Sequence, residues 1–206
     1  MTSAAPFTST HRRRGRPREF DLNQALDKAV GIFCERGYHA TSIGDLTAAM
    51  QLAAGSVYKA FKDKKSVFLA AFDRYKLVRN TMLDDAVSAG ATGRERVGKA
   101  LSFYANASHG AMGRQGCLII GCATQLATFD EDVAKRVGNS LARSEAFMAE
   151  LIRQGQADGS IPAHVDGDAT ARLMLCLVQG MRVVGKTGRT RAEMAMVADV
   201  AMRALA

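Results

Sequence analysis

The chain has 206 residues, of which 48% are hydrophobic and 6% aromatic, with no Trp and three Pro. This is enough for one large or two small domains, and scarce Pro beside abundant Ala, Leu and Met predicts an all-α protein. The sequence has no run of 18 apolar residues, so we expect no membrane span, and the polar N-terminus lacks the apolar segment of a signal peptide. The four Cys do not form a disulfide framework, which predicts reduced thiols and a cytoplasmic protein.

The formal net charge of +8 is distributed unevenly along the chain. Residues 1–80 hold 14 Lys and Arg against 7 Asp and Glu, whereas residues 81–206 hold 14 against 13. A basic N-terminal part on a nearly neutral body is the charge pattern of a nucleic-acid binder, although a basic surface can also serve solubility alone. Charge by itself leaves both interpretations open.

Residues 1–19 are polar and rich in Arg, which predicts a basic flexible arm. Its Arg-Gly-Arg-Pro segment suits an extended backbone in a narrow minor groove, so Arg14, Arg16 and Arg18 are expected to contact DNA. The alternative is a tail that serves only solubility. We favour DNA contact because basic arms beside small helical DNA-binding units reach the adjacent groove.

Four helices are expected in the first 90 residues. The first starts after Asp21 and ends at Gly37, and Ser42 with Asp45 three residues later marks a second helix of about two turns. A third short helix is expected over residues 54–60, and a fourth, long helix begins near residue 63 or 64. Two short helices joined by three or four residues and braced by another helix form a helix-turn-helix unit, which we expect over residues 20–66.

The third helix is expected to enter the major groove of DNA. Its small residues at 54–56 allow close approach, Tyr58 can reach phosphate and sugar, and Lys59 can reach a base edge or a phosphate. Lys64 is expected at a phosphate because it starts a helix, whereas Lys62 and Lys65 add only positive field. The residues of this unit expected at DNA are Thr41, Ser42, Ala54, Gly55, Ser56, Tyr58, Lys59 and Lys64.

One motif in this region reads Thr41-Ser42-Ile43-x-Asp45-Leu46-x-x-Ala49-x-x-Leu52-x-x-Gly55-Ser56-Val57-Tyr58-x-x-Phe61-x-x-Lys64. It resembles the N-terminal domain of the TetR/AcrR family of bacterial transcriptional regulators, and the resemblance covers about residues 20–72. It implies a homodimer on palindromic double-stranded DNA and a C-terminal domain that binds a small-molecule effector. Gly44 stands where some members carry a base-contacting basic residue, so we expect no base contact from the second helix.

Residues 67–206 are expected to form a helical effector-binding and dimerisation domain, giving about nine helices in all. Further helices are predicted at 93–109, 118–128, 130–157, 166–186 and 190–205, with a glycine-rich connection at 110–116. The last two carry apolar stripes with small residues, which suit a two-fold four-helix contact with a second copy. The residues predicted at this interface are Leu173, Leu177, Gly180, Met181, Val184, Met194, Val197, Ala198, Ala201 and Leu205.

The middle helices are expected to enclose an effector pocket, although ordinary core packing is the alternative for each residue. Met and aromatic side chains with few ionisable groups would suit a mostly apolar or aromatic ligand. The candidate lining residues are Phe103, Tyr104, His109, Met112, Gln125, Phe129, Phe147 and Met174.

The segment Gly116-Cys117-Leu118 resembles one found in a branch of the family in which some members sense electrophiles or oxidants through cysteine. A thiol at a helix N-terminus can have a lowered pKa, so Cys117 is a candidate redox-sensing residue; a small buried hydrophobe is the favoured alternative. Cys117 and Cys122 lie about 140° apart around a helix. They make a poor metal site, and we expect no metal and no cofactor.

Together these features predict a sequence-specific DNA-binding transcriptional regulator, a repressor released from its operator by a small-molecule effector or by cysteine modification. The alternative is a non-specific architectural DNA-binding protein, which the neutral C-terminal body disfavours. An enzyme is not expected, because the sequence has no Cys-His-Asp order and no Gly-rich phosphate loop.

Overall fold

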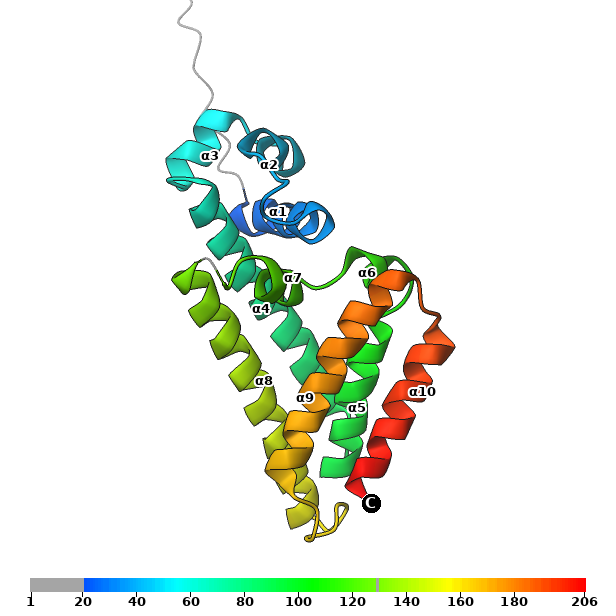
Figure 1. Cartoon of the computed structure of the whole chain (residues 1–206). Helices are drawn as coiled ribbons and strands as arrows, with labels where there is room; N and C mark the ends of the chain where they lie inside the picture. The colour runs from blue at the N-terminus through cyan, green and yellow to red at the C-terminus, as the bar shows by residue number, and fades with distance from the viewer. Residues whose placement is uncertain (1–20, 129) are drawn as a thin grey trace, which may run out of the picture.

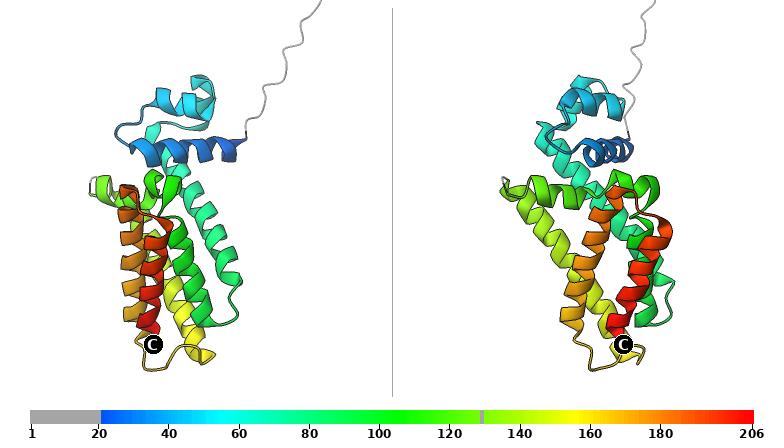
Figure 2. Two further views of the ribbon diagram at one scale, coloured as in Figure 1. Left: turned by 90° about the vertical axis from the view of Figure 1, so that its right-hand side faces the viewer. Right: turned by 45° about the vertical axis from the view of Figure 1, so that its right-hand side comes forward.

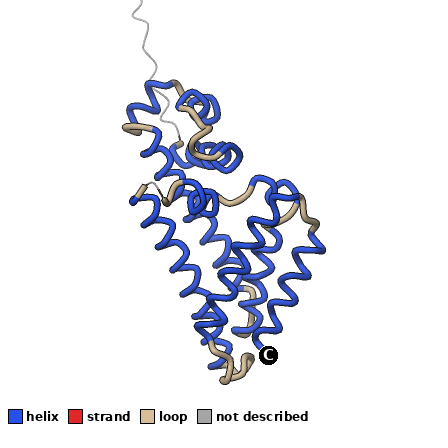
Figure 3. Tube along the Cα trace, in the orientation of Figure 1, coloured by secondary structure: helices blue, strands red, loops and turns tan. Residues whose placement is uncertain are grey.

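The computed structural model describes residues 21–128 and 130–206 (Figure 1). This part of the chain forms helices and no strand (Figure 3), so the all-α prediction is confirmed. The α-helices are α1 (Leu22–Arg36), α2 (Ile43–Met50), α3 (Ala54–Ala60), α4 (Lys64–Ser88), α5 (Gly93–Asn106), α6 (Gly110–Gln115), α7 (Leu118–Gln125), α8 (Glu131–Ala157), α9 (Gly167–Val184) and α10 (Arg191–Ala201). Two 3-10 turns, η1 (Gly185–Thr187) and η2 (Met202–Leu205), follow α9 and α10.

Short polar side chains start the N-terminal helices. Asp21 caps α1 by accepting hydrogen bonds from two backbone N–H groups. Ser42 and Asp45 form a reciprocal capping box at α2, and Asp63 and Ser66 form another at α4. Each box satisfies backbone donors that the first helical turn leaves without a partner, so the expected starts near residues 42 and 63 are confirmed.

The nine expected helices are all present, and α6 is an additional short helix in the segment predicted to be a connection. That local prediction is wrong because tertiary packing outweighs the low helix propensity of glycine there. A Cβ atom on Gly113 would lie 2.8 Å from the backbone carbon of Ser108 and 3.1 Å from the carbonyl oxygen of Gly185. Glycine therefore lets α6 pack directly against the chain before it and against η1.

Helix α1 packs on the first half of α4, and α2 and α3 share one core with them and complete the head of the molecule (Figure 1). Their core does not end at α4, because α7 and the start of α8 complete it from below. The largest contributors from the head are Phe33, Leu46, Val57, Phe68 and Phe72, and those from α7 and α8 include Leu118, Cys122, Leu126, Val133 and Val137. A movement of α7 would therefore directly change the packing of the core that holds α1 to α3.

The body below the head is built around α5, which contacts α4, α8, α9 and α10 (Figure 2). Leu101, Ile152 and Met174 are completely buried in its core. Two glycines bring α5 and α8 unusually close, since a Cβ on Gly93 would lie 2.0 Å from the backbone nitrogen of Gly155. No helix of the described chain is long and apolar enough to cross a membrane.

The predicted boundary between residues 66 and 67 falls inside α4, which runs from the head into the body. Lys65, near the start of α4, also pairs with Asp130 and Asp132 at the start of α8, each at 2.8 Å. The head and body are thus joined by a continuous helix and by an ion-pair cluster. The division into 20–66 and 67–206 stays a prediction.

Candidate nucleic-acid interface and effector site

Helix α3 presents one face to the protein and the other to solvent. Val57 is 1% exposed and packs in the head core, whereas Tyr58 is 57% exposed and Ala54, Gly55 and Lys59 are also exposed. A Cβ on Gly55 would meet nothing within 4 Å, so no contact inside the protomer requires a glycine there. Ser56 is half-buried. Helix α3, which carries this face of small residues, a phenol and an ammonium group, lies at the end of the molecule opposite the C-terminus (Figure 1).

The connection between α2 and α3 is a tight, braced turn. Gln51 has a left-handed backbone with φ of 57°, and its N–H bonds to the carbonyls of Thr47 and Ala48. Lys28 of α1 donates a 2.7 Å hydrogen bond to the Gln51 side chain. Three residues therefore separate α2 from α3, and α1 braces them. This is the helix-turn-helix arrangement predicted from the sequence.

Two side chains expected at DNA are engaged inside the head instead. Thr41 is 1% exposed, and its hydroxyl donates a 2.7 Å hydrogen bond to the carbonyl of Gly37, so the prediction of a DNA contact by this side chain is wrong. The Lys64 ammonium donates 3.0 Å hydrogen bonds to the carbonyls of Tyr38 and Thr41 and lies 4.3 Å from the Tyr38 ring centroid. Lys64 thus fastens the α1–α2 turn to α4, and the predicted phosphate contact is corrected to this bracing role.

The remaining basic and polar residues of the predicted interface have mixed outcomes. Ser42 is exposed, but its hydroxyl is part of the α2 capping box. Lys65, expected to add only positive field, forms the ion pairs with α8, while Lys62 is exposed. Arg14, Arg16 and Arg18 lie outside the described residues.

The seven candidate pocket residues that the structure describes do not come together in one cavity. Phe103 and Tyr104 line a cavity of about 30 Å³ between α4, α5, α8 and α9, and Phe147 lines a neighbouring cavity of about 230 Å³. Gln125 lines a crevice between α1 and α7, and Met174 lies at a groove between α9 and α10. Met112 is 50% exposed on α6, His109 precedes that helix, and Phe129 lies outside the described residues.

The predicted dimer residues divide between an outer and an inner face of α9 and α10. Leu173, Leu177, Gly180, Val184, Val197 and Ala201 are exposed or half-buried. The other four are buried in the core of the same protomer, so their assignment to the interface is wrong: Met181, Met194, Ala198 and Leu205. Sequence reasoning missed Met196 and Val200, which are 63% and 53% exposed on the outer face.

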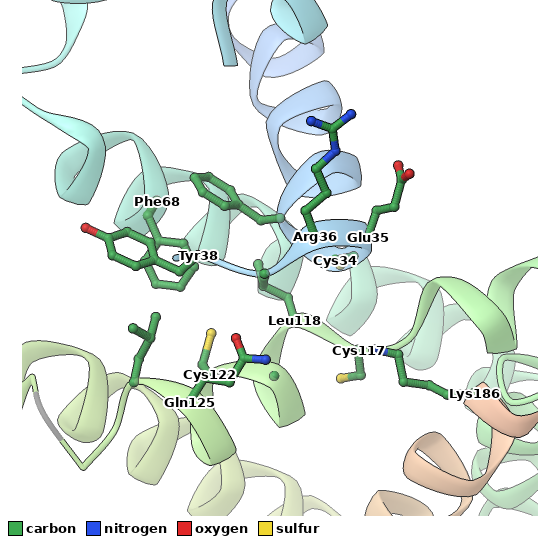
Figure 4. Close-up of a pocket in the computed structure, with 14 residues that line it drawn as sticks. Cys34, Glu35, Arg36, Tyr38, Phe68, Cys117, Leu118, Cys122, Gln125 and Lys186 are labelled. Atoms are coloured by element: carbon green, nitrogen blue, oxygen red, sulfur yellow. The ribbon is translucent and has the colours of Figure 1, made fainter. Parts of the chain in front are cut away.

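Three of the four cysteines line the crevice between α1 and α7 (Figure 4). Burial raises the pKa of the Cys34 and Cys122 thiols to about 12 each. Cys117 precedes α7 and accepts a hydrogen bond from the Tyr75 hydroxyl, with 3.4 Å between oxygen and sulfur. Burial also raises the pKa of Tyr75. Cys117 lines both this crevice and the cavity that contains Phe103 and Tyr104. Its redox-sensing role stays a prediction.

A helix-turn-helix head with one exposed short helix, above an all-helical body, is the architecture of a DNA-binding regulator of the helix-turn-helix class. Comparison with known proteins gives the family. Residues 25–71 match the model of the bacterial regulatory proteins of the tetR family, and residues 93–201 match the tetracyclin repressor-like C-terminal domain. The chain belongs to the TetR family, and it is a sequence-specific DNA-binding transcriptional regulator.

Individual relatives agree over nearly the whole length. The transcriptional repressor ComR of Escherichia coli is 32% identical over 92% of this chain and 91% of its own. The transcriptional regulator AcuR of Cereibacter sphaeroides is 27% identical over 83% of this chain and 81% of its own. Among solved structures, a cysteine variant of the TetR-family regulator CifR with 26-base-pair operator DNA has a TM-score of 0.82 and 28% identity, covering 91% of this chain and 98% of that one.

Proposed function

We propose that this regulator is a cytoplasmic, non-enzymatic repressor that binds its operator through α3 and leaves it when a small molecule enters the body. The observation that carries this proposal is the exposed face of α3, whose opposite face is fixed by the head core. The repressor activity named for ComR supports the sign of regulation. The units involved are a basic arm over residues 1–19, the reading unit at 20–66 and the effector-binding and dimerisation unit at 67–206.

Within the reading unit, Ala54, Gly55 and Ser56 would allow the backbone of α3 to approach the groove floor. Tyr58 would contact phosphate and sugar, and Lys59 a base edge or a phosphate. The open space beside Gly55 supports this assignment, because the missing side chain leaves room for DNA to approach the backbone of α3. Arg14, Arg16 and Arg18 would extend the contact into the adjacent minor groove.

The outer face of α9 and α10 would form the dimer interface. Its groove of about 560 Å³ is lined mainly by apolar side chains, including Leu173, Leu177, Met196 and Val200. Contiguous exposed apolar surface of this kind marks a protein–protein contact. Gly180 adds to this, because a Cβ there would meet nothing within 4 Å in the protomer, which leaves space for close approach by a second copy. A two-fold dimer would set two α3 helices on half-sites about 34–36 Å apart.

The proposal is tested by fluorescence anisotropy with DNA that flanks the gene, against shuffled DNA of the same composition, over a salt series. We expect selective binding, and Lys59→Ala should weaken it and reduce the log–log salt slope by about 1. Lys62→Ala, which removes an equal charge outside α3, is the matched control. Equal affinity for native and shuffled DNA would instead support a non-specific architectural protein.

The dimer is tested separately by light scattering. Met196→Glu should give monomers, because it places a charge in the apolar groove. Leu77→Glu is the matched control, since Leu77 on α4 is 62% exposed and Met196 is 63% exposed. A Met196→Glu protein that stays dimeric would refute this interface.

A further inference from the structure

A buried guanidinium in the body has an unused donor group. Arg182 of α9 is 3% exposed, and its Nη2 donates to the carbonyl of Gly116. Within residues 21–128 and 130–206, its Nη1 has no hydrogen-bond partner, and Arg182 forms no ion pair. A guanidinium stays protonated when buried, and a buried charge without a counter-charge is strongly unfavourable. The site therefore favours a negative group beside Nη1.

The surroundings of Arg182 strengthen this requirement. It lines the cavity of about 30 Å³ together with Lys76 and Arg79 of α4, and no Asp or Glu of the described residues lines it with them. The Arg79 guanidinium lies 4.2 Å from the centroid of the Phe103 ring, which holds it at the cavity. Tyr104 contributes a hydroxyl-bearing side chain to the lining. Three cationic side chains thus line a cavity to which the described residues contribute no carboxylate.

The shape of the space indicates what the anion carries. The cavity beside Arg182 has room for only a few atoms, but the neighbouring cavity of about 230 Å³ shares Asn80 and Ser144 with it. Leu83 and Phe147 add apolar surface there, beside the exposed Asp84 and Arg143. A small charged end and a larger, partly apolar body would fit the two spaces together.

We propose that the effector is a small carboxylic acid, bound as its carboxylate against Arg182 and Arg79, with its carbon skeleton toward Phe103, Leu83 and Phe147. The planar fork of a guanidinium matches a carboxylate, and the narrow cavity suits this flat group better than a tetrahedral phosphate. The inference rests on the proposed ligand-released repressor and names its ligand class. It replaces the mostly apolar ligand expected from the sequence, because Arg182 could not be recognised as buried there.

The test compares two carboxylates, sodium acetate and sodium benzoate, with their neutral amides, acetamide and benzamide. Sodium chloride at matched ionic strength controls for salt, and phosphate is the alternative anion. Binding is measured on the DNA-free protein by thermal shift and calorimetry. We expect both carboxylates, but neither amide, to raise the melting temperature. Arg182→Gln should weaken benzoate binding about 10- to 100-fold, since it removes charge-assisted hydrogen bonds. Arg79→Gln should also weaken benzoate binding. Arg153→Gln, which removes an exposed charge on α8, should leave benzoate binding unchanged.

The outcomes separate the ligand class from the function. If carboxylates and amides act alike, if phosphate alone binds, or if no compound shifts the wild-type protein, the carboxylate assignment is wrong. These comparisons need no variant, so a misfolded Arg182→Gln protein does not weaken them. Operator affinity of the ligand-free protein, measured in parallel, tests the proposed repressor independently. Carboxylates that bind but do not release operator DNA would refute the effector role of this site.

Discussion

Replacing Lys64 with Met distinguishes a bracing role from a phosphate contact. The variant keeps the aliphatic stem but removes two 3.0 Å hydrogen bonds to backbone carbonyls and the contact with the Tyr38 ring. Charge-assisted hydrogen bonds contribute about 1.5–3 kcal/mol each and an exposed cation–π contact about 0.5–1 kcal/mol. Because Lys64 is half-buried, solvent reduces these values, and we expect a total loss of about 2–3 kcal/mol in the free energy of unfolding.

The assay is urea unfolding followed by circular dichroism, with operator affinity measured on the same samples. Lys62→Met is the control, because a surface substitution should change stability by less than about 0.5 kcal/mol. Lys59→Met should lose operator affinity without losing stability. If Lys64→Met unfolds at the wild-type urea concentration while its operator affinity falls, Lys64 is a phosphate contact and the bracing role is wrong.

Three further experiments test other parts of the structure. Tyr58→Ala should weaken binding to native and shuffled DNA alike in anisotropy titrations, and unchanged affinity would refute the placement of the reading face. Gly93→Ala should cost about 3 kcal/mol or more in urea unfolding, because its Cβ would lie 2.0 Å from the backbone of α8; Gly138→Ala, at an exposed position of α8 with nothing within 4 Å, should gain about 0.4–1 kcal/mol. The Cys34 and Cys122 thiols have pKa values raised by burial from 9.0 to about 12, so their contribution to stability is complete below pH 9 and is lost as pH rises toward 12. Between pH 8 and pH 10.5 the urea midpoint should fall less in a variant with both residues changed to Ala than in the wild type. An equal fall in the two proteins would contradict this assignment.

The parts of the fold predicted from the sequence depend on residues close together in the chain. The capping box of Ser42 and Asp45 joins residues three apart, and the helical period separates Val57 from Tyr58 as inner and outer positions. Lys64 shows the opposite case. Its partners lie 23 and 26 residues earlier, so only the folded head reveals that its ammonium group is engaged.

The apolar stripes on α9 and α10 show a second limit. Helical spacing finds apolar positions, but it does not say whether the same chain or a second copy covers them. Met194 and Met196 are separated by two positions, yet one is 3% and the other 63% exposed. Only the position of α10 against α5 decides which of these residues face the protomer core.

The cavity and the head meet at the connection between α6 and α7, which would give the proposed effector a physical route to α1 and to the helices that pack on it. The Arg182 guanidinium donates a hydrogen bond to the carbonyl of Gly116, and the Tyr75 hydroxyl donates one to the sulfur of Cys117. Two side chains that line the cavity therefore bind adjacent residues of this connection. The next residue, Leu118, is already part of the head core. A carboxylate beside Nη1 would draw the Arg182 guanidinium toward itself and so weaken the hydrogen bond from its Nη2 to the Gly116 carbonyl. The ligand would then favour a different position of this connection, and α7 would carry the difference to α1 and α4.

Changing Tyr75 to Phe tests this route, because it removes the hydrogen bond to the sulfur of Cys117 without removing a charge. Because Tyr75 lines the cavity, benzoate binding and operator release are both measured on this variant. We expect the ratio of the benzoate concentration for half-maximal release to that for half-maximal binding to differ from the wild-type ratio, and an unchanged ratio would refute the route.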